Sequence, residues 1–225
     1  MDGGKGTSPV AVLVSGGVDS AVLTADLCER HAAVFPLFIR GGLIWEDAEL
    51  RHLQDFLRAI DRPELRPLKV LDLPLRDVYG DHWGTTGRGV PGAETPDDAV
   101  FLPGRNLLLI GKAAVWCALN DVEVLALGSL AANPFGDSTP EFDEAMSGLV
   151  RRALGKPLRI ERPFAQLSKA DVLRRGAKLP LERTFSCINP MRGTHCGRCN
   201  KCAERRRGFE EAGISDRTSY SHALR

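Results

Sequence analysis

The sequence is poor in aromatic residues, in excess charge of either sign and in long hydrophobic runs. Phe, Trp and Tyr make up 6% of its 225 residues, and 30 basic side chains balance 29 acidic ones to a formal net charge of +1. Proteins that bind nucleic acid over a broad surface are usually strongly basic, so we expect no nucleic-acid partner. No apolar run is long enough to span a bilayer and residues 1–10 lack an apolar signal region, so we predict no membrane span, no export and a cytoplasmic location.

Cysteine is also scarce: the chain has only six, yet four of them lie within residues 187–202. Thiols stay reduced in the cytosol, which excludes a disulfide framework and favours metal binding by this cluster. The other two, Cys28 and Cys117, lie in apolar stretches with helical spacing, and we expect them to be small core residues. Hydrophobic residues at 43% and charged residues at 26% are ordinary for one large domain, or for one domain with a small appendage.

Strand and helix patterns alternate along the chain. Short apolar or β-branched runs predict strands at residues 10–14, 32–39, 65–73, 122–129 and 157–163. Apolar residues at helical spacing predict helices at residues 18–30, 44–60, 105–120, 141–152, 168–178 and 202–212. The alternation predicts an α/β fold with a doubly wound parallel sheet, in which ligands bind at the carboxyl ends of the strands.

Three segments carry further signals. The helix at 105–120 is apolar on nearly all sides, so we expect it to be buried. Ser168 as N-cap, with Asp171 three residues later, comes close to a capping box at the start of the helix at 168–178. Residues 74–100 hold five glycines and three prolines without a regular pattern. An irregular segment of this length predicts either a lid over a ligand site or a mobile insertion.

The string "SGGVDS" follows the first predicted strand and opens the first helix. Gly16 and Gly17 allow a sharp turn and a close backbone approach to a ligand, and the amides at the start of a helix attract anions. Asp19 would repel phosphate unless Mg²⁺ bridges the two. A plain strand–helix turn is the alternative, but the full string favours a nucleotide site. The predicted nucleotide-binding residues here are Val14, Ser15, Gly16, Gly17, Val18, Asp19 and Ser20, with Asp19 and Ser20 also candidates for catalysis.

The cysteine cluster has the spacing Cys-x8-Cys-x2-Cys-x2-Cys. Close thiolate pairs of this kind are typical of a closed tetrahedral Zn²⁺ site, which is structural because it keeps no open position. An iron–sulfur cluster is the alternative, although the continuation of the ferredoxin motif is missing. His195 could compete as a ligand, and the basic residues among 187–207 leave contact with RNA open. The predicted ligands are Cys187, Cys196, Cys199 and Cys202.

These motifs resemble a known enzyme family. "SGGVDS" resembles the PP-loop of the ATP-pyrophosphatase superfamily, whose members bind the pyrophosphate end of ATP and transfer AMP to an acceptor oxygen. Together with "FLPGRN" (101–106), the loop at 128–142, "LSKADV" (167–172) and the segment at 184–209, it resembles the 7-cyano-7-deazaguanine synthases in order and spacing. The resemblance implies a Rossmann-like fold of the adenine nucleotide alpha hydrolase type. We expect a PP-loop domain at residues 1–185 and a zinc-binding segment at 186–225 packed on it.

The resemblance also implies a reaction. ATP would activate the carboxylate of 7-carboxy-7-deazaguanine, ammonia would give the amide, and a second activation would yield the nitrile used in queuosine biosynthesis. Lys169 is assigned to the phosphates and to catalysis, and Arg105 and Asn106 to the nucleotide or substrate site. Gly128, Ser129 and Asp137 are assigned to the substrate. The family implies a homodimer. Plainer roles stay open: Lys169 as a solvated lysine, Arg105 and Asn106 as a helix start, and Asp137 as a turn residue.

Two stretches depart from the family pattern. "IRGGLIWED" stands where the family commonly has Tyr-Gly-Gln-Arg-His, and "NPFGDSTPEF" lacks the Cys and Arg of the family loop. A ligase for another carboxylate acceptor is therefore an alternative, whereas direct action on tRNA is disfavoured by the balanced charge. A non-catalytic zinc-knuckle module that binds nucleic acid would explain the cysteines but leave "SGGVDS" unexplained.

Overall fold

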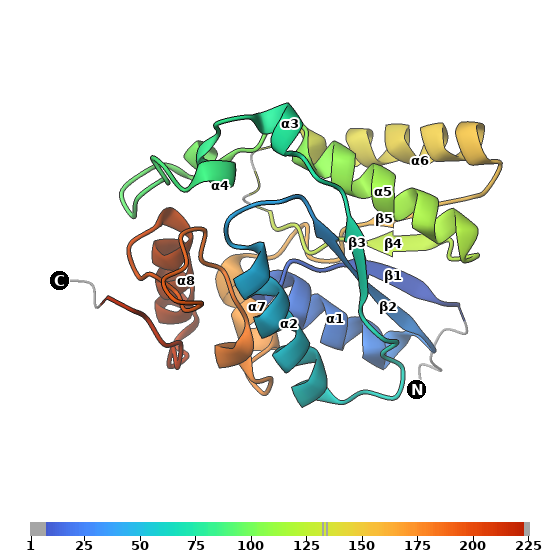
Figure 1. The fold of residues 1–225 in the computed structure, drawn as a ribbon. Coiled ribbons are helices and arrows are strands. Elements are labelled where there is room, and N and C mark those ends of the chain that lie inside the picture. Colours follow the sequence, from blue (N-terminus) through green and yellow to red (C-terminus); the bar gives the residue numbers. More distant parts are fainter. Residues whose placement is uncertain (1–7, 132, 134, 223–225) are drawn as a thin grey trace.

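The computed structural model describes residues 8–131, 133 and 135–222. The described residues do not include 1–7 and 223–225, which belong to the two predicted units, nor Ala132 and Pro134 of the loop at 128–142. The centre of the molecule is a five-stranded sheet with the order β3-β2-β1-β4-β5, parallel throughout (Figure 1). Its strands are β1 (Val10–Leu13), β2 (Val34–Arg40), β3 (Lys69–Asp72), β4 (Val124–Ala126) and β5 (Arg159–Glu161).

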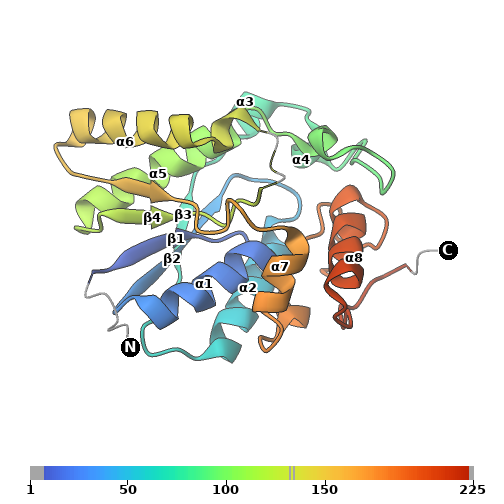
Figure 2. The same ribbon diagram turned by 180° about the vertical axis from the view of Figure 1, so that it is seen from behind.

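Helices cover both faces of this sheet, as two views of the ribbon show (Figures 1 and 2). One face carries α1 (Val18–Arg30), α2 (Glu46–Ile60) and α7 (Lys169–Arg175), with α8 (Asn200–Ala212) beside α7. The other carries α5 (Arg105–Leu119) and α6 (Pro140–Leu154). Alternate strand residues serve the two faces: Val10 and Val12 join the α1 core, and Ala11 joins the α5 core. The predicted doubly wound α/β fold is confirmed.

The chain order of the strands reverses between β1 and β4, because the chain runs outward from β1 to β2 and β3 and then returns to β4 on the other side. In open parallel sheets a reversal of this kind opens a crevice at the carboxyl ends of the two central strands. The turn after β1 holds Ser15–Ser20 and the turn after β4 holds Gly128 and Ser129. The fold therefore brings these two predicted segments together.

The prediction that the helix at 105–120 is buried on nearly all sides is wrong. In α5 the fully buried residues are Ile110, Ala113, Ala114 and Cys117. Leu107 is 45% exposed, Val115 46% and Leu119 79%. One side of α5 packs on the sheet and on α6, and no further layer of the described chain covers the opposite side. Apolar composition alone does not say how many neighbours a helix has.

The predicted lid contains two short helices, α3 (Arg76–Tyr79) and α4 (Trp83–Thr86), and a 3₁₀ turn, η1 (Asp97–Val100). Trp83 stacks on Trp45 with ring centroids 5.5 Å apart, which ties the segment to the start of α2. Asn200, at the start of α8, donates its backbone N–H to Pro91 (3.0 Å) and its side-chain amide to the carbonyl of Thr95 (2.8 Å). Residues 74–100 thus bridge α2 and the cysteine segment, and their action as a lid stays a prediction.

The ends of several elements differ from their predicted bounds. Strands β1 and β4 end before their apolar runs do, because Val14 and Leu127 lie buried in the turns that follow. Strand β2 extends one residue beyond its run, to Arg40, and β3 begins only at Lys69. Helix α7 starts with the expected capping box of Ser168 and Asp171 but ends at Arg175. Helix α8 begins at Asn200, two residues before the predicted start, which makes Lys201 a helical residue. Among the described residues, no helix combines the length and apolar character that crossing a membrane requires.

Candidate active site

The turn after β1 is stabilised by its own serines. Ser20 Oγ accepts the backbone N–H of Ser15 (3.2 Å) and donates to the carbonyl of Gly17 (3.2 Å), while Ser15 Oγ accepts the N–H of Gly17 (3.4 Å). Gly17 caps α1 without a side-chain hydrogen bond to the first turn, so the helix presents its amides to the turn. This arrangement is typical of an anion site.

Two glycines permit the close packing around this turn. Gly16 has φ +77°, and a Cβ there would lie 2.9 Å from the carbonyl oxygen of Glu49 on α2. Gly128 packs on the first turn of α1, where a Cβ would lie 3.0 Å from the backbone nitrogen of Ser20. Both positions require glycine for steric reasons, and together they fix α2, α1 and the end of β4 around one crevice.

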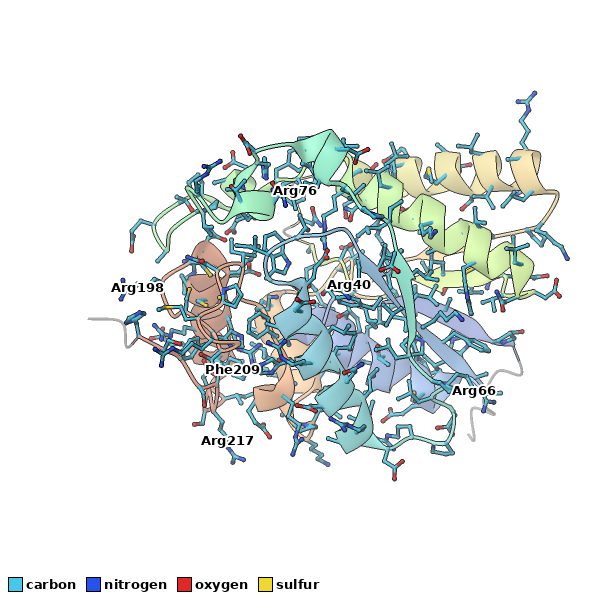
Figure 3. The ribbon with its side chains drawn as sticks, viewed as in Figure 1. Arg40, Arg66, Arg76, Arg198, Phe209 and Arg217 are labelled. Atoms are coloured by element: carbon cyan, nitrogen blue, oxygen red, sulfur yellow. The ribbon has the colours of Figure 1, made fainter. Side chains whose placement is uncertain are left out.

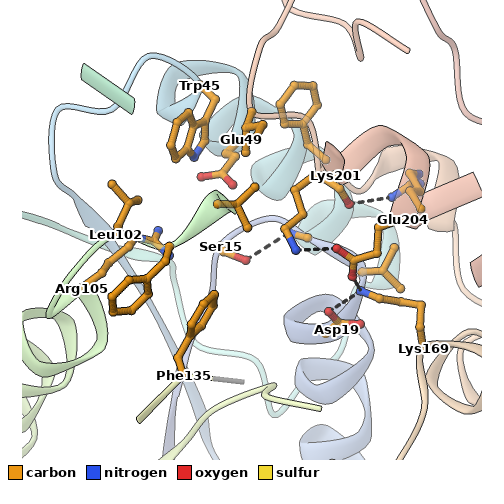
Figure 4. A pocket seen from close by; sticks show the side chains of 18 of the residues that line it. Ser15, Asp19, Trp45, Glu49, Leu102, Arg105, Phe135, Lys169, Lys201 and Glu204 are labelled. Carbon is orange, nitrogen blue, oxygen red and sulfur yellow. Dashed lines mark hydrogen bonds and ion pairs between the residues drawn. The ribbon is translucent and has the colours of Figure 1, made fainter. Parts of the chain in front are cut away.

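Four charged side chains, which we call the charged tetrad, line the crevice: Asp19, Lys169, Lys201 and Glu204 (Figure 4). Lys169 Nζ lies 2.6 Å from Asp19 Oδ2 and 3.2 Å from Glu204 Oε1. Lys201 Nζ lies 2.5 Å from Glu204 Oε2. Each carboxylate thus neutralises a neighbouring ammonium group, and the tetrad has no net charge.

Two members of the tetrad, Lys169 and Glu204, stay ionised at neutral pH. Burial by itself would lower the pKa of Lys169, but Asp19 and Glu204 raise it above its usual value. Burial by itself would raise the pKa of Glu204, but Lys169 and Lys201 lower it to about 2. A lysine pair beside the turn after β1 is suited to binding phosphate oxygens.

Two adjoining cavities meet at the tetrad. The larger, about 620 Å³, runs along the turn after β1 to Gly128 and Ser129. The smaller, about 250 Å³, has an aromatic wall that includes Trp45 and Phe135. Phe135 also stacks on Phe101, with ring centroids 4.8 Å apart. A cavity along the turn after β1 that adjoins an aromatic one is suited to a nucleotide next to a flat heterocycle.

Glu49, on the first turn of α2, lines both cavities and was missed by the sequence analysis. Burial raises its pKa well above the ordinary value of 4.5; Glu46 raises it further, and Arg105 acts in the opposite direction. The apolar spacing that predicts the helix at residues 44–60 does not reveal which of its polar residues face a cavity.

Asp137 lies in the wall of the smaller cavity, but its carboxylate is already engaged. Its two oxygens accept the backbone N–H of Asn106 (3.1 Å) and the side-chain amide of Asn106 (3.0 Å), so Asp137 caps the start of α5. Arg162, which follows β5, supports this loop: its guanidinium binds Ser129 and Ser138 and forms two hydrogen bonds to Asp143 (2.5 and 2.7 Å). No sequence pattern indicates this role of Arg162.

The four cysteines of the C-terminal segment form a compact buried cluster, and their four sulfur atoms all lie within 4.8 Å of one another. The Sγ atoms of Cys187 and Cys199 are 3.8 Å apart, and those of Cys196 and Cys202 are 3.9 Å apart. Zn–S bonds of ~2.3 Å in a tetrahedron place the sulfurs ~3.8 Å apart. Cys196 and Cys187 accept backbone N–H groups at 3.3 Å, which favours thiolates. The cluster fits a metal ion held by four thiolates.

The thiols influence one another strongly. The neighbouring thiols lower the pKa of Cys196 far below its usual value and raise the pKa of Cys187. Thiols this close cannot all ionise unless a cation balances them. His195 is not part of the cluster, because its Nε2 accepts the backbone N–H of Ser186 at 3.1 Å. The predicted ligand set of four cysteines thus lies together without the histidine.

Nearly all of the predicted nucleotide and substrate residues lie in the walls of the two cavities. They are Val14, Ser15, Gly17, Val18, Asp19, Ser20, Arg105, Asn106, Gly128, Ser129, Asp137 and Lys169. Gly16 lies behind the turn, against the backbone of Glu49. Asp19 Oδ1 is buried and has no hydrogen-bond partner within the described chain, which leaves one carboxylate oxygen suited to a divalent cation.

A parallel sheet with "SGGVDS" at its switch point and a charged crevice above it defines a PP-loop protein of the adenine nucleotide alpha hydrolase type. Residues 9–213 match the family described as "Queuosine biosynthesis protein QueC", and the chain belongs to that family.

Individual proteins of the family are similar over nearly the whole chain. The 7-cyano-7-deazaguanine synthase of Anaeromyxobacter dehalogenans is 32% identical over 93% of this chain and 94% of that protein. The one from Methanopyrus kandleri is 33% identical over 93% of this chain and 97% of that protein. A solved structure, described as a predicted subunit of a tRNA methyltransferase from Methanocaldococcus jannaschii, has a similar fold, with a TM-score of 0.52 at 14% identity over 92% and 89% of the two chains.

Proposed function

We propose that the chain is an ATP-dependent ligase that converts 7-carboxy-7-deazaguanine and ammonia into 7-cyano-7-deazaguanine for queuosine biosynthesis. The observation that carries the proposal is the match of residues 9–213 to the QueC family. The crevice supports it, because Asp19 and Lys169 stand beside the turn after β1 and adjoin an aromatic cavity that fits a flat heterocycle.

The proposed reaction has two activations. A carboxylate oxygen of the acid bonds to the α-phosphorus of ATP and pyrophosphate leaves; ammonia then attacks the carboxyl carbon, and AMP and a proton leave to give the amide. The amide oxygen bonds to the α-phosphorus of a second ATP and pyrophosphate leaves. Loss of AMP and of the two amide protons then gives the nitrile.

We assign the stabilisation of the phosphate charge to groups that are already in place. The amides at the start of α1 and the ammonium group of Lys169 face the cavity where the phosphates would lie, and fixed positive groups there stabilise charge that develops during transfer. Asp19 Oδ1 is the group that would hold Mg²⁺. The substrate would lie between the aromatic wall and the loop that carries Ser129 and Asp137.

We propose that the cysteine cluster holds Zn²⁺ in a structural role. Four thiolates fill a tetrahedral ion, which leaves no position for a reacting group. The cluster stands at the start of α8 and orders the segment that contacts residues 74–100. Residues 1–185 and 186–225 then act as a PP-loop domain and an attached zinc segment, with 74–100 as the lid.

The test is incubation of the purified protein with ATP, Mg²⁺, ammonium and 7-carboxy-7-deazaguanine, with mass spectrometry for the amide and the nitrile. The Lys169→Met variant should lose at least ~100-fold in kcat/KM, since it removes a positive group that faces the phosphates. Lys156→Met is the matched control, because Lys156 pairs with Asp121 on the surface and should leave the rate unchanged. Formation of AMP without amide or nitrile would instead point to another carboxylate acceptor.

We also propose a homodimer, as the family resemblance implies, in the cytoplasm. The support for the dimer is a row of exposed apolar side chains on α5, formed by Leu107, Val115 and Leu119. Light scattering coupled to gel filtration should give twice the chain mass for the wild type. A Val115→Lys and Leu119→Lys double variant should run as a monomer if this row is the interface.

A further inference from the structure

Lys201 connects the cysteine cluster to the crevice above the sheet. Its position in the chain is between Cys199 and Cys202, in the first turn of α8. Its side chain points away from the cluster and lines both cavities, with Nζ 2.5 Å from Glu204 Oε2 (Figure 4). A residue whose backbone lies among the metal ligands thus places a positive charge beside Asp19 and Lys169.

The charges of the crevice require this lysine. Asp19 and Glu204 both contact Lys169, so these three groups alone carry a net charge of −1. The polyphosphate of a nucleotide would be repelled by such a set. Lys201 cancels the excess, and its ammonium has the shortest contact to Glu204, on the oxygen that Lys169 does not use. Helix α8 thus adds the negative charge of Glu204 and the positive charge of Lys201 together, and Lys201 keeps the tetrad neutral.

Arg105 also lines both cavities and is already assigned to the nucleotide or substrate site, where it acts on the carboxyl group of Glu49. Two other cations in the cavity walls are less suited to binding phosphate. Arg205 is buried, and its guanidinium donates to the carbonyl of Leu181 (2.8 Å), to Thr184 (2.8 Å) and to Thr218 (2.9 Å), so its donors hold the C-terminal segment together. Arg207 is exposed at the rim of the larger cavity.

We propose that Lys201 is a nucleotide-binding residue, which contacts a phosphate of ATP through Nζ, and that Glu204 pairs with the ammonium groups of Lys169 and Lys201 and competes with phosphate for them. This inference rests on the proposed use of ATP. It makes the cysteine segment part of the nucleotide site, because ligation of Cys199 and Cys202 fixes the backbone on either side of Lys201.

The test compares Lys201→Gln with Arg198→Gln. Arg198 belongs to the same segment and carries the same charge, but it is exposed at the periphery of the molecule (Figure 3). Calorimetric titration with ATP and Mg²⁺, without the acid, gives Kd, and elemental analysis gives metal per chain. We expect Lys201→Gln to raise the Kd for ATP at least ~10-fold, which corresponds to about 1.4 kcal/mol, and Arg198→Gln to leave it unchanged. Metal content should match the wild type in both.

The Glu204→Gln variant should have the opposite effect. It removes one negative charge from the crevice and frees both ammonium groups for phosphate, so ATP should bind roughly threefold more tightly. This variant keeps the test decisive if Lys201→Gln fails to fold or loses metal, because weaker ATP binding by Glu204→Gln would then overturn the proposal.

The outcomes separate this inference from the proposed function. A wild-type protein that binds no ATP would refute the proposed function itself. Alternatively, the wild type binds ATP while Lys201→Gln keeps its full metal content and a Kd for ATP within twofold of the wild-type value. That result would refute the role of Lys201 and leave the proposed function standing. An equal loss of ATP affinity in Arg198→Gln would also refute the role of Lys201, since the effect would then come from overall charge and not from contact with the phosphate.

Discussion

The buried ion pair below the loop at 128–138 yields the strongest prediction about stability. The Arg162 and Asp143 side chains are only 6% and 10% exposed and are joined by two hydrogen bonds. Arg162→Met removes the guanidinium and leaves the Asp143 carboxylate buried without its cation. Breaking a buried pair in this way costs about 3–5 kcal/mol of folding free energy. The lost contacts to Ser129 and Ser138 are part of this cost, because effects within one network do not simply add.

Urea unfolding followed by circular dichroism measures the effect. With an m value of roughly 2.5 kcal/mol/M for a chain of this size, a loss of about 4 kcal/mol lowers the midpoint by roughly 1.6 M. Arg159→Met is the matched control on the adjoining strand β5, because Arg159 pairs with Glu161 at the surface with 73% and 40% of the two side chains exposed. That change should cost well under about 1 kcal/mol.

A second variant distinguishes the loss of the pair from the loss of packing. Replacing both partners, as in Arg162→Met with Asp143→Leu, removes the unpaired charge and should be closer to the wild type than Arg162→Met alone. Arg162→Met within about 1 kcal/mol of the wild type would contradict the reasoning. So would a double variant whose loss equals the sum of the two single losses, since the partners would then be independent.

Three further changes test other parts of the molecule. Gly16→Ala should destabilise more than Gly155→Ala in urea unfolding, because both glycines have positive φ but only Gly16 would place a Cβ against backbone, 2.9 Å from a carbonyl oxygen. Because the pKa of Glu49 is raised in the folded protein, its neutral form stabilises the fold below pH 4.5, and this contribution is lost as pH rises toward the folded pKa. The Glu49→Gln variant should therefore gain stability relative to the wild type as pH rises. Equal curves of unfolding free energy against pH for the two proteins would contradict this. Cys199→Ser should lose metal by elemental analysis, whereas Cys117→Ser, a change at a buried cysteine outside the cluster, should keep it.

Much of the fold was predictable because its signals are local. Val10–Val14 is apolar and β-branched, two glycines follow, and the next thirteen residues have helical spacing, so neighbouring residues alone specify strand, turn and helix. The capping box at Ser168 is equally local. The exposed side of α5 was not predictable, because its apolar residues resemble those of a helix with neighbours on every side.

The candidate site also has parts that were predictable from local sequence and parts that were not. The cysteine spacing indicated a four-thiolate cluster, since the ligands lie within sixteen residues and one short loop brings them together. Arg162 and Glu49 carried no signal, because their roles depend on which loop or cavity lies against them. Lys201 was assigned to the basic surroundings of the cluster, and only the packing of α8 against α7 showed that its side chain enters the crevice.

The sequence by itself determined the alternation of strands and helices, the turn at Ser15–Ser20 and the four cysteines, because each is specified by residues close together in the chain. The tertiary structure decided which charges meet. Asp19 and Lys169 are 150 residues apart in sequence, but their charged groups are 2.6 Å apart in space, and Glu204 lies 3.2 Å from the same ammonium group. Such contacts depend on the order of the strands and on the docking of α8, which no short stretch of sequence encodes.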